Sequence, residues 1–332
     1  LISFEDSLPE GGGLLVLGGP SFDTSSQLEF DEALHRLKPE LFAQALDSPT
    51  PFRGMRSDCP NFKDVRFKPL PASAEETERI ATLWERTVGP DQTVCRLTGD
   101  EANEGSVKRL APGRRILHLA THGFFLGETC LAGPATGRGI SRLAPSLTES
   151  VSVAADGSAE GILATSAAAG LVRESGTDSL SSRQVTNPLL LSGIALAGAN
   201  RREFVGPDED DGILTAEEIA SLNLSGVEWA VLSACNTGLG EIGTGVGEGV
   251  FGLRRALQVA GARTVILSLW DLRDEVALRW MELLYEARLR DRLDTAQAVH
   301  TATLGLLRER RAAGESTHPF YWAGLVAAGD WH

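Results

Sequence analysis

The chain has 332 residues, 42% of them hydrophobic and 23% charged, values typical of a globular protein. Its net charge of -14 argues against direct nucleic-acid binding, because such binding needs lysine and arginine to displace counterions. No apolar run approaches the roughly 20 residues of a membrane span, and no signal-peptide pattern opens the sequence. We therefore expect a cytoplasmic protein without a membrane partner. The first residue is Leu1 rather than Met, which is compatible with a fragment of a longer chain.

In chain order, apolar patterns of the first half predict strands over 14–17, 93–97 and 116–120 and helices over 74–87 and 101–110. Ser73 and Glu76 have the spacing of a helix capping box. The N-terminal segment 1–66 is irregular after its first strand, apart from one short helix around 30–45. Strands that alternate with helices indicate a parallel sheet covered on both faces.

Residues 127–187 interrupt this alternation. The stretch is rich in glycine, alanine and serine, and no aromatic residue occurs between Phe125 and Phe204. A segment of this composition cannot supply a packed core. We therefore expect a long flexible insertion inside a single domain that spans 1–332.

The second half returns to ordered patterns, with predicted strands over 229–232, 264–269 and 320–328 and helices over 215–222, 250–260, 274–290 and 294–311. Thr215 and Glu218 have capping-box spacing, and Asp274 and Asp294 are predicted N-caps.

The four cysteines are Cys59, Cys95, Cys130 and Cys235. They have no CxxC spacing and are too few for a disulfide framework in a chain of this length. We expect reduced thiols, with no metal and no cofactor.

Two predicted strands each end in a reactive side chain followed by small residues: His122 after 116–120, and Cys235 after 229–232. A neutral imidazole beside a thiol can generate the thiolate needed for acyl transfer. Neighbouring parallel strands would bring the two residues together at their carboxyl ends. Gly123 permits close approach of a carbonyl, and its N–H, with that of Cys235, is a candidate oxyanion donor. Taken singly, each side chain has an ordinary alternative, a structural histidine or an inert buried cysteine.

His122 and Cys235 are 113 positions apart, and the separation is 52 without the 61 residues of 127–187. Caspase-type enzymes place the histidine about 50 residues before the cysteine. The count therefore fits a caspase-like core interrupted by a loop.

A series of motifs makes the resemblance specific: HLATHG at 118–123, DGILTAEEI at 211–219, LSACNTGLG at 232–240, GEGVFGL at 247–253, AGARTV at 260–265, SLW at 268–270 and HPFYWAG at 318–324. In this order they resemble CHAT-domain cysteine proteases of the caspase–separase clan. The resemblance implies a three-layer α/β/α sandwich with a mainly parallel six-stranded sheet. It also implies cleavage of protein substrates through a thioester, with Cys235 as nucleophile and His122 as general base and acid. The insertion at 127–187 is long for the family.

The same resemblance suggests the substrate-binding residues. Ser233, two positions before Cys235, would line the first specificity pocket, and an extended segment after the next strand, Ser268, Leu269, Trp270 and Asp271, would pair with the substrate. Trp270 is equally compatible with core packing. The acidic candidates for binding a basic substrate side chain are Asp210, Asp211, Glu248 and Asp271, although a cap or a solvated surface carboxylate is the commoner role.

Two other functions remain open. The chain could be a catalytically silent CHAT scaffold that binds peptides. Much more weakly, Gly238, Gly240 and Gly243 match the GxGxxG of dinucleotide-binding proteins, but the candidate acid Asp271 lies 33 positions after Gly238, beyond the usual ~20.

Relatives of this kind resemble bacterial effectors controlled by a sensor module, such as TPR repeats, in the same or another chain. We therefore expect a regulated protease, with antiphage defence and activation of gasdermin-type substrates as examples of its role. The insertion 127–187 is a candidate for self-cleavage or autoinhibition.

Overall fold

The computed structural model describes residues 11–24, 52, 62, 64–89, 92–126, 188–206, 209–233, 246–270 and 272–330. All of them belong to one compact unit. Residues 133–185 lie outside the described residues. The expected helix around 30–45 and the insertion 127–187 also fall outside them.

Six strands form the main sheet, in the order β2 (Val94–Gly99), β1 (Leu14–Pro20), β3 (Ile116–Ala120), β7 (Trp229–Leu232), β8 (Thr264–Ser268) and β9 (Leu325–Gly329). All neighbouring pairs are parallel except β8 and β9. The mainly parallel six-stranded sheet predicted from the sequence is therefore confirmed.

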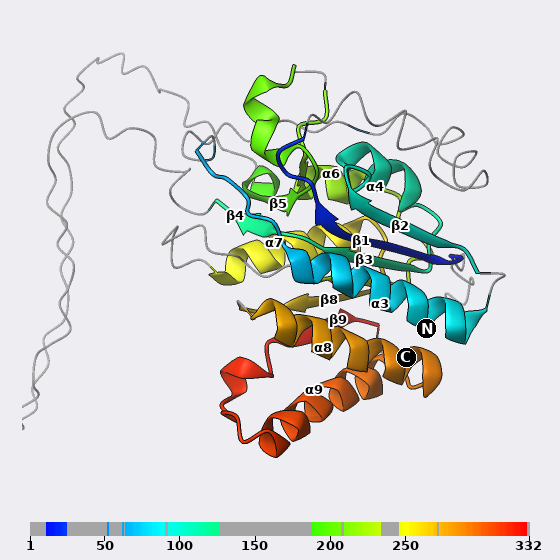
Figure 1. Ribbon diagram of the computed structural model, residues 1–332. Coiled ribbons are helices and arrows are strands. Elements are labelled where there is room, and N and C mark those ends of the chain that lie inside the picture. The colour runs from blue at the N-terminus through cyan, green and yellow to red at the C-terminus, as the bar shows by residue number, and fades with distance from the viewer. Residues whose placement is uncertain are drawn as a thin grey trace, which may run out of the picture. The chain divides into compact units, whose positions relative to one another are not determined.

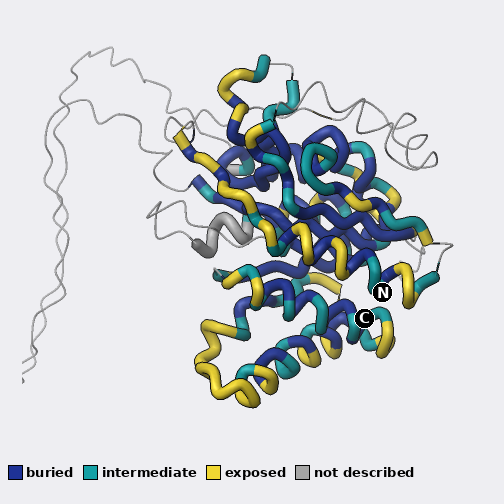
Figure 2. Tube along the Cα trace, in the orientation of Figure 1, coloured by how far each residue is buried: buried dark blue, intermediate teal, exposed yellow. Residues whose placement is uncertain are grey.

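Helices cover both faces of this sheet (Figure 1). One face carries α3 (Pro71–Val88), α8 (Asp274–Tyr285) and α9 (Thr295–Ala312), and the other carries α4 (Glu104–Leu110), α6 (Ala216–Ser221) and α7 (Val246–Val259). Successive strand side chains point to opposite faces. In β1, Val16 packs with Trp84 and Trp280, whereas Leu17 belongs to the cluster that contains Val107 and Leu257. The strands are accordingly buried between the two helical layers (Figure 2).

A smaller antiparallel sheet, absent from the sequence-based prediction, follows the same order as the chain: β4 (Gly123–Phe125), β5 (Ser192–Ala195) and β6 (Ile213–Thr215). Its strands have three or four residues each, too few for a clear alternation of apolar and polar positions. Short 3-10 helices, η2 (Pro188–Leu191) and η3 (Ala199–Phe204), flank β5.

Two helix starts differ from prediction. Helix α3 begins at Pro71 with Leu70 as its N-cap, and the Ser73 hydroxyl instead donates to the Leu70 carbonyl and accepts from the Gly19 N–H. Proline at the first helical position explains the earlier start, because its fixed φ suits that position. Likewise, Asp274 is the first helical residue of α8 rather than its cap.

Other boundaries are confirmed or shifted slightly. Thr215 and Glu218 form the predicted capping box, and Asp294 accepts from the Gln297 N–H at the start of α9. Helix α8 ends in a π-helical turn, η4 (Glu286–Arg290), and the last strand begins only after a short η5 (Pro319–Tyr321). None of the helices in the described part of the chain is long and apolar enough to cross a membrane.

Candidate active site

The candidate site lies at the carboxyl ends of the neighbouring strands β3 and β7. Leu119 is in parallel register with Leu232, and the Ser233 N–H donates to the Leu119 carbonyl at 3.0 Å. His122 lies two positions after β3, and Cys235 is two positions after Ser233. Cys235 and the loop after it fall outside the described residues. The structure therefore describes His122 and the strand that leads to Cys235, but not Cys235 itself.

His122 is a buried imidazole with a defined tautomer. Its Nε2 lies 2.7 Å from the backbone carbonyl oxygen of Lys68. A carbonyl oxygen only accepts, so Nε2 carries the proton and Nδ1 is the basic nitrogen. Burial lowers the pKa of His122, and the Lys68 carbonyl and the Asp274 carboxylate partly oppose this shift. The neutral imidazole, the form required of a base, is therefore favoured near neutral pH.

Aromatic rings enclose the imidazole. The rings of Phe22 and Phe67 lie 5.3 Å and 5.6 Å from it, centroid to centroid, and both belong to a buried cluster with Phe124. The Asn200 side chain fixes the Phe67 backbone, accepting from its N–H at 2.7 Å and donating to its carbonyl at 2.9 Å. Because Lys68 follows Phe67, these bonds also help to orient the carbonyl that holds His122. The sequence did not reveal the aromatic wall of Phe22 and Phe67 or the Lys68 carbonyl. A backbone carbonyl is common to every residue type, so no sequence pattern marks it.

Gly123 begins the edge strand β4 of the smaller sheet. It pairs with Ile194, and the Ala195 N–H donates to the His122 carbonyl at 2.9 Å. This pattern makes Gly123 and Ile194 a non-hydrogen-bonded pair, so the Gly123 N–H points away from β5. Its direction is compatible with the expected role as oxyanion donor.

Ser233 lines a small cavity of about 20 Å³, room for roughly one water molecule. The other lining residues are Leu70, Ala72, Ser73, Glu76, Thr121, Asp274 and Ala277. Two of them carry carboxylates. Glu76 accepts a hydrogen bond from His118 Nε2 at 2.8 Å, and both residues are buried. The carboxylate of the half-buried Asp274, by contrast, has no hydrogen bond or ion pair among the described residues.

The sequence did not reveal that Asp274 lines this cavity beside Ser233. Burial and the neighbouring Glu275 raise its pKa, and His122 lowers it. Asp274 lines the same small cavity as Thr121, the residue before His122, and its charge raises the pKa of the imidazole. The sequence-based assignment of Asp274 as a helix cap hid this proximity.

The predicted substrate-pairing segment is joined to the C-terminal region. Ser268 pairs with Leu325 in the β8–β9 ladder, and the Leu269 N–H donates to the Gly324 carbonyl at 2.7 Å. The Trp270 indole donates to the Phe320 carbonyl and stacks on the Phe320 ring. A side chain at position 324 would meet the Trp270 indole about 3.0 Å away, which explains glycine there. These contacts favour a packing role for Trp270; Asp271 lies outside the described residues.

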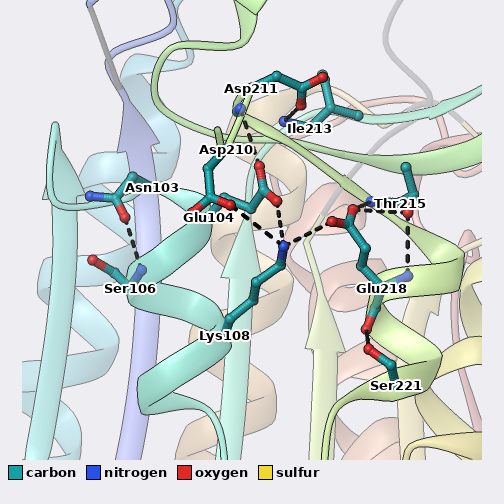
Figure 3. A network of polar contacts seen from close by, with 11 residues as sticks. Asn103, Glu104, Ser106, Lys108, Asp210, Asp211, Ile213, Thr215, Glu218 and Ser221 are labelled. Atoms are coloured by element: carbon teal, nitrogen blue, oxygen red, sulfur yellow. Dashed lines mark hydrogen bonds and ion pairs between the residues drawn. The ribbon is translucent and has the colours of Figure 1, made fainter. Parts of the chain in front are cut away.

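Two of the acidic candidates belong to a buried network around Lys108 (Figure 3). The Lys108 ammonium lies 2.5 Å from Glu104, 2.8 Å from Glu218 and 3.7 Å from Asp210. Asp211 accepts from the Ile213 N–H at 3.0 Å. These carboxylates join α4 to the segment before α6, and this structural role accounts for them. Glu248 has no described side chain.

The three-layer fold, with its six-stranded mainly parallel sheet, defines a caspase-like α/β protein. The family model of the CHAT domain matches residues 3–330, so the chain belongs to the CHAT family over essentially its whole length. A search of curated proteins finds no match. Family membership favours a protease-related function over dinucleotide binding.

Proposed function

We propose that the protein is a cysteine endopeptidase that cleaves protein substrates with His122 and Cys235. The observation that carries the proposal is the parallel register of β3 and β7, which brings the end of the His122 strand beside Ser233. Two residues of extended chain span at most ~7 Å, so Cys235 must lie within that reach of Ser233.

The tautomer of His122 supports a specific first step. With Nε2–H donated to the Lys68 carbonyl, Nδ1 accepts the proton of the Cys235 thiol. The thiolate then attacks the scissile carbonyl carbon, and the carbonyl electron pair moves onto oxygen. In this proposal the N–H groups of Gly123 and Cys235 stabilise the resulting oxyanion.

The second half of the reaction returns the dyad to its starting state. His122 gives its proton to the leaving amine as the C–N bond breaks, which leaves a thioester on Cys235. A water molecule, deprotonated by His122, attacks the thioester and releases the acid product and the thiol. The aromatic wall of Phe22 and Phe67 keeps the imidazole out of bulk water and oriented between these steps.

Replacement of the nucleophile tests the proposal. We expect Cys235→Ala to abolish cleavage of a peptide selected from a library while thermal unfolding stays unchanged. Cys95→Ala is a matched thiol control: Cys95 is buried in β2, and burial raises its pKa to about 11. Undiminished cleavage by Cys235→Ala would refute the proposal.

Thiol alkylation distinguishes the peptidase from a silent peptide-binding scaffold. An activated Cys235 should react with iodoacetamide much faster near pH 7 than the other thiols, because only the thiolate is nucleophilic. Equal rates at all accessible cysteines, together with retained peptide binding, would favour the scaffold. Peptide mapping after a short exposure to iodoacetamide measures the extent of alkylation at each cysteine.

We also infer that the activity is regulated, as in a cytoplasmic effector controlled by a sensor module such as TPR repeats in the same or another chain. Antiphage defence and gasdermin-type substrates remain examples of such a role. Support comes from the place of the insertion in the chain: it joins β4, which directly follows His122, to the η2 helix that leads into β5.

A further inference from the structure

A second, larger pocket lies at the opposite ends of the strands. Its volume is about 270 Å³, and Gly11, Gln92, Arg115, Gly226, Glu228 and Arg263 line it. These residues come shortly before β1, β2, β3, β7 and β8, so the pocket is at the amino ends of the parallel strands. The candidate active site, by contrast, is at their carboxyl ends.

The side-chain acceptors of this pocket are already engaged. Glu228 accepts from Arg115 Nε at 2.7 Å with one oxygen and from Arg288 with the other. The Gln92 amide oxygen accepts from the Gly13 N–H at 3.0 Å. The Gly226 carbonyl accepts from the Gly11 N–H at 3.1 Å.

Several side-chain donors of the pocket, by contrast, have no partner among the described residues. Among the described residues, the Gln92 amide nitrogen, the terminal nitrogens of Arg115 and the whole guanidinium of Arg263 have no hydrogen bond or ion pair. The Nε of Arg263 is moreover buried without a partner. A buried donor that lacks a partner is unfavourable, and a bound acceptor or an ordered water removes that cost.

The charge of the pocket also favours an anionic ligand. Two guanidinium groups, Arg115 and Arg263, line the pocket with the single lining carboxylate of Glu228, which also pairs with Arg288 from outside the lining. This local excess of positive charge stands out in a chain with a net charge of -14. Backbone bonds keep the groups in place: the Glu228 N–H donates to the Arg115 carbonyl, and the Arg263 N–H donates to the Val227 carbonyl.

We propose that this pocket binds a small ligand through a phosphate group. Arg115 and Arg263, at the starts of β3 and β8, supply several guanidinium donors, which suit an oxyanion with several acceptor oxygens better than the two oxygens of a carboxylate. The Gln92 amide at the start of β2 is a further donor in the same pocket. The site is separate from the proposed dyad and does not depend on its chemistry.

The test uses the whole chain and inorganic phosphate. At constant ionic strength, we expect phosphate to raise the midpoint of thermal unfolding in a saturable manner, and acetate or chloride to do so far less. Isothermal titration calorimetry then gives the affinity for phosphate. Arg263→Gln should weaken binding about tenfold or more, because it removes charge-assisted hydrogen bonds.

Two variants make the result decisive. Arg263→Lys keeps the positive charge but loses the planar guanidinium, so it should bind phosphate with intermediate affinity. This variant also provides the test if Arg263→Gln does not fold. Arg308→Gln, exposed on α9 and remote from the lining, is the matched control and should bind like the original chain. A thermal shift that is identical for phosphate and chloride, or unchanged by both Arg263 substitutions, would overturn the proposal and indicate a water-filled pocket.

Discussion

At the residue scale, the protonation state of His122 determines when the proposed dyad can work. A base must be unprotonated, so activity is lost as the pH falls through the pKa of His122. Burial lowers that pKa, so we expect the acidic limb of kcat/KM to have its midpoint below the ordinary histidine value of about 6.5. Asp274→Asn removes a carboxylate that raises the pKa of His122 and should therefore move the limb to still lower pH.

The control for this pH profile is Glu275→Gln. Glu275 is an exposed neighbour of Asp274 that pairs with Arg273 at 3.4 Å, and it is not among the groups that shift His122. Its substitution should leave the acidic limb in place. A midpoint above 6.5 in the original chain, or no difference between it and Asp274→Asn, would contradict this account of His122.

Asp274 also bears on substrate choice. Its carboxylate has no ion-pair partner among the described residues and lines the cavity beside Ser233. We expect a preference for lysine or arginine before the scissile bond, with the cationic end held at the mouth of this small cavity. Asp274→Asn should lower kcat/KM for such peptides about tenfold and spare peptides with leucine there, measured on the pH plateau. An equal loss for both peptide classes would mean that Asp274 acts on catalysis only.

At the scale of elements, the Lys108 network joins α4 to the capping box of α6. Lys108 is buried with Glu104 and Glu218, and these carboxylates repel each other once the ammonium is removed. Lys108→Met should cost about 3–5 kcal/mol of the free energy of unfolding at pH 7.5. Breaking the exposed Arg66–Glu203 pair by Arg66→Met is the control and should cost less than about 1 kcal/mol.

The pH dependence of this loss has a definite sign. Burial, followed by Glu218 and Asp210, raises the pKa of Glu104 well above its ordinary value. A carboxyl with a raised pKa binds its proton more tightly in the folded state, so it favours folding at acidic pH and opposes it as the pH rises. The defect of Lys108→Met in urea unfolding should therefore shrink at pH 5.5. A defect that grows on acidification would contradict this interpretation of the network.

At the scale of the whole molecule, the sequence was sufficient for the main sheet because several of its strands are continuous apolar runs, such as Trp229–Leu232. It also indicated which strand ends carry the candidate dyad. It did not reveal the smaller sheet, whose strands are too short to show a period. It also missed the Lys68 carbonyl and the position of Asp274 near His122, because both depend on tertiary packing between segments far apart in the chain.

The insertion 127–187 provides the test of regulation at this scale. The insertion connects Leu126, next to β4, with Pro188, the first residue of η2, and the Leu126 N–H donates to the Leu191 carbonyl at the other end of η2. A linker of about five Gly, Asn and Ser residues can therefore join the two described segments. Loop-closure entropy changes slowly with loop length, so the shortened protein should unfold at a similar temperature. If the insertion restrains the site, its removal should raise kcat/KM several-fold for a short reporter peptide.

A shuffled insertion of the same length and composition separates sequence-specific inhibition from simple obstruction of the site. Specific autoinhibition predicts that the shuffled chain is as active as the shortened one, whereas obstruction predicts that it stays as inactive as the original. Self-cleavage predicts fragments from the original chain that disappear in Cys235→Ala. Unchanged activity and unchanged processing in the shortened protein would rule out a regulatory role for this segment, and control would then have to act on the domain through another surface.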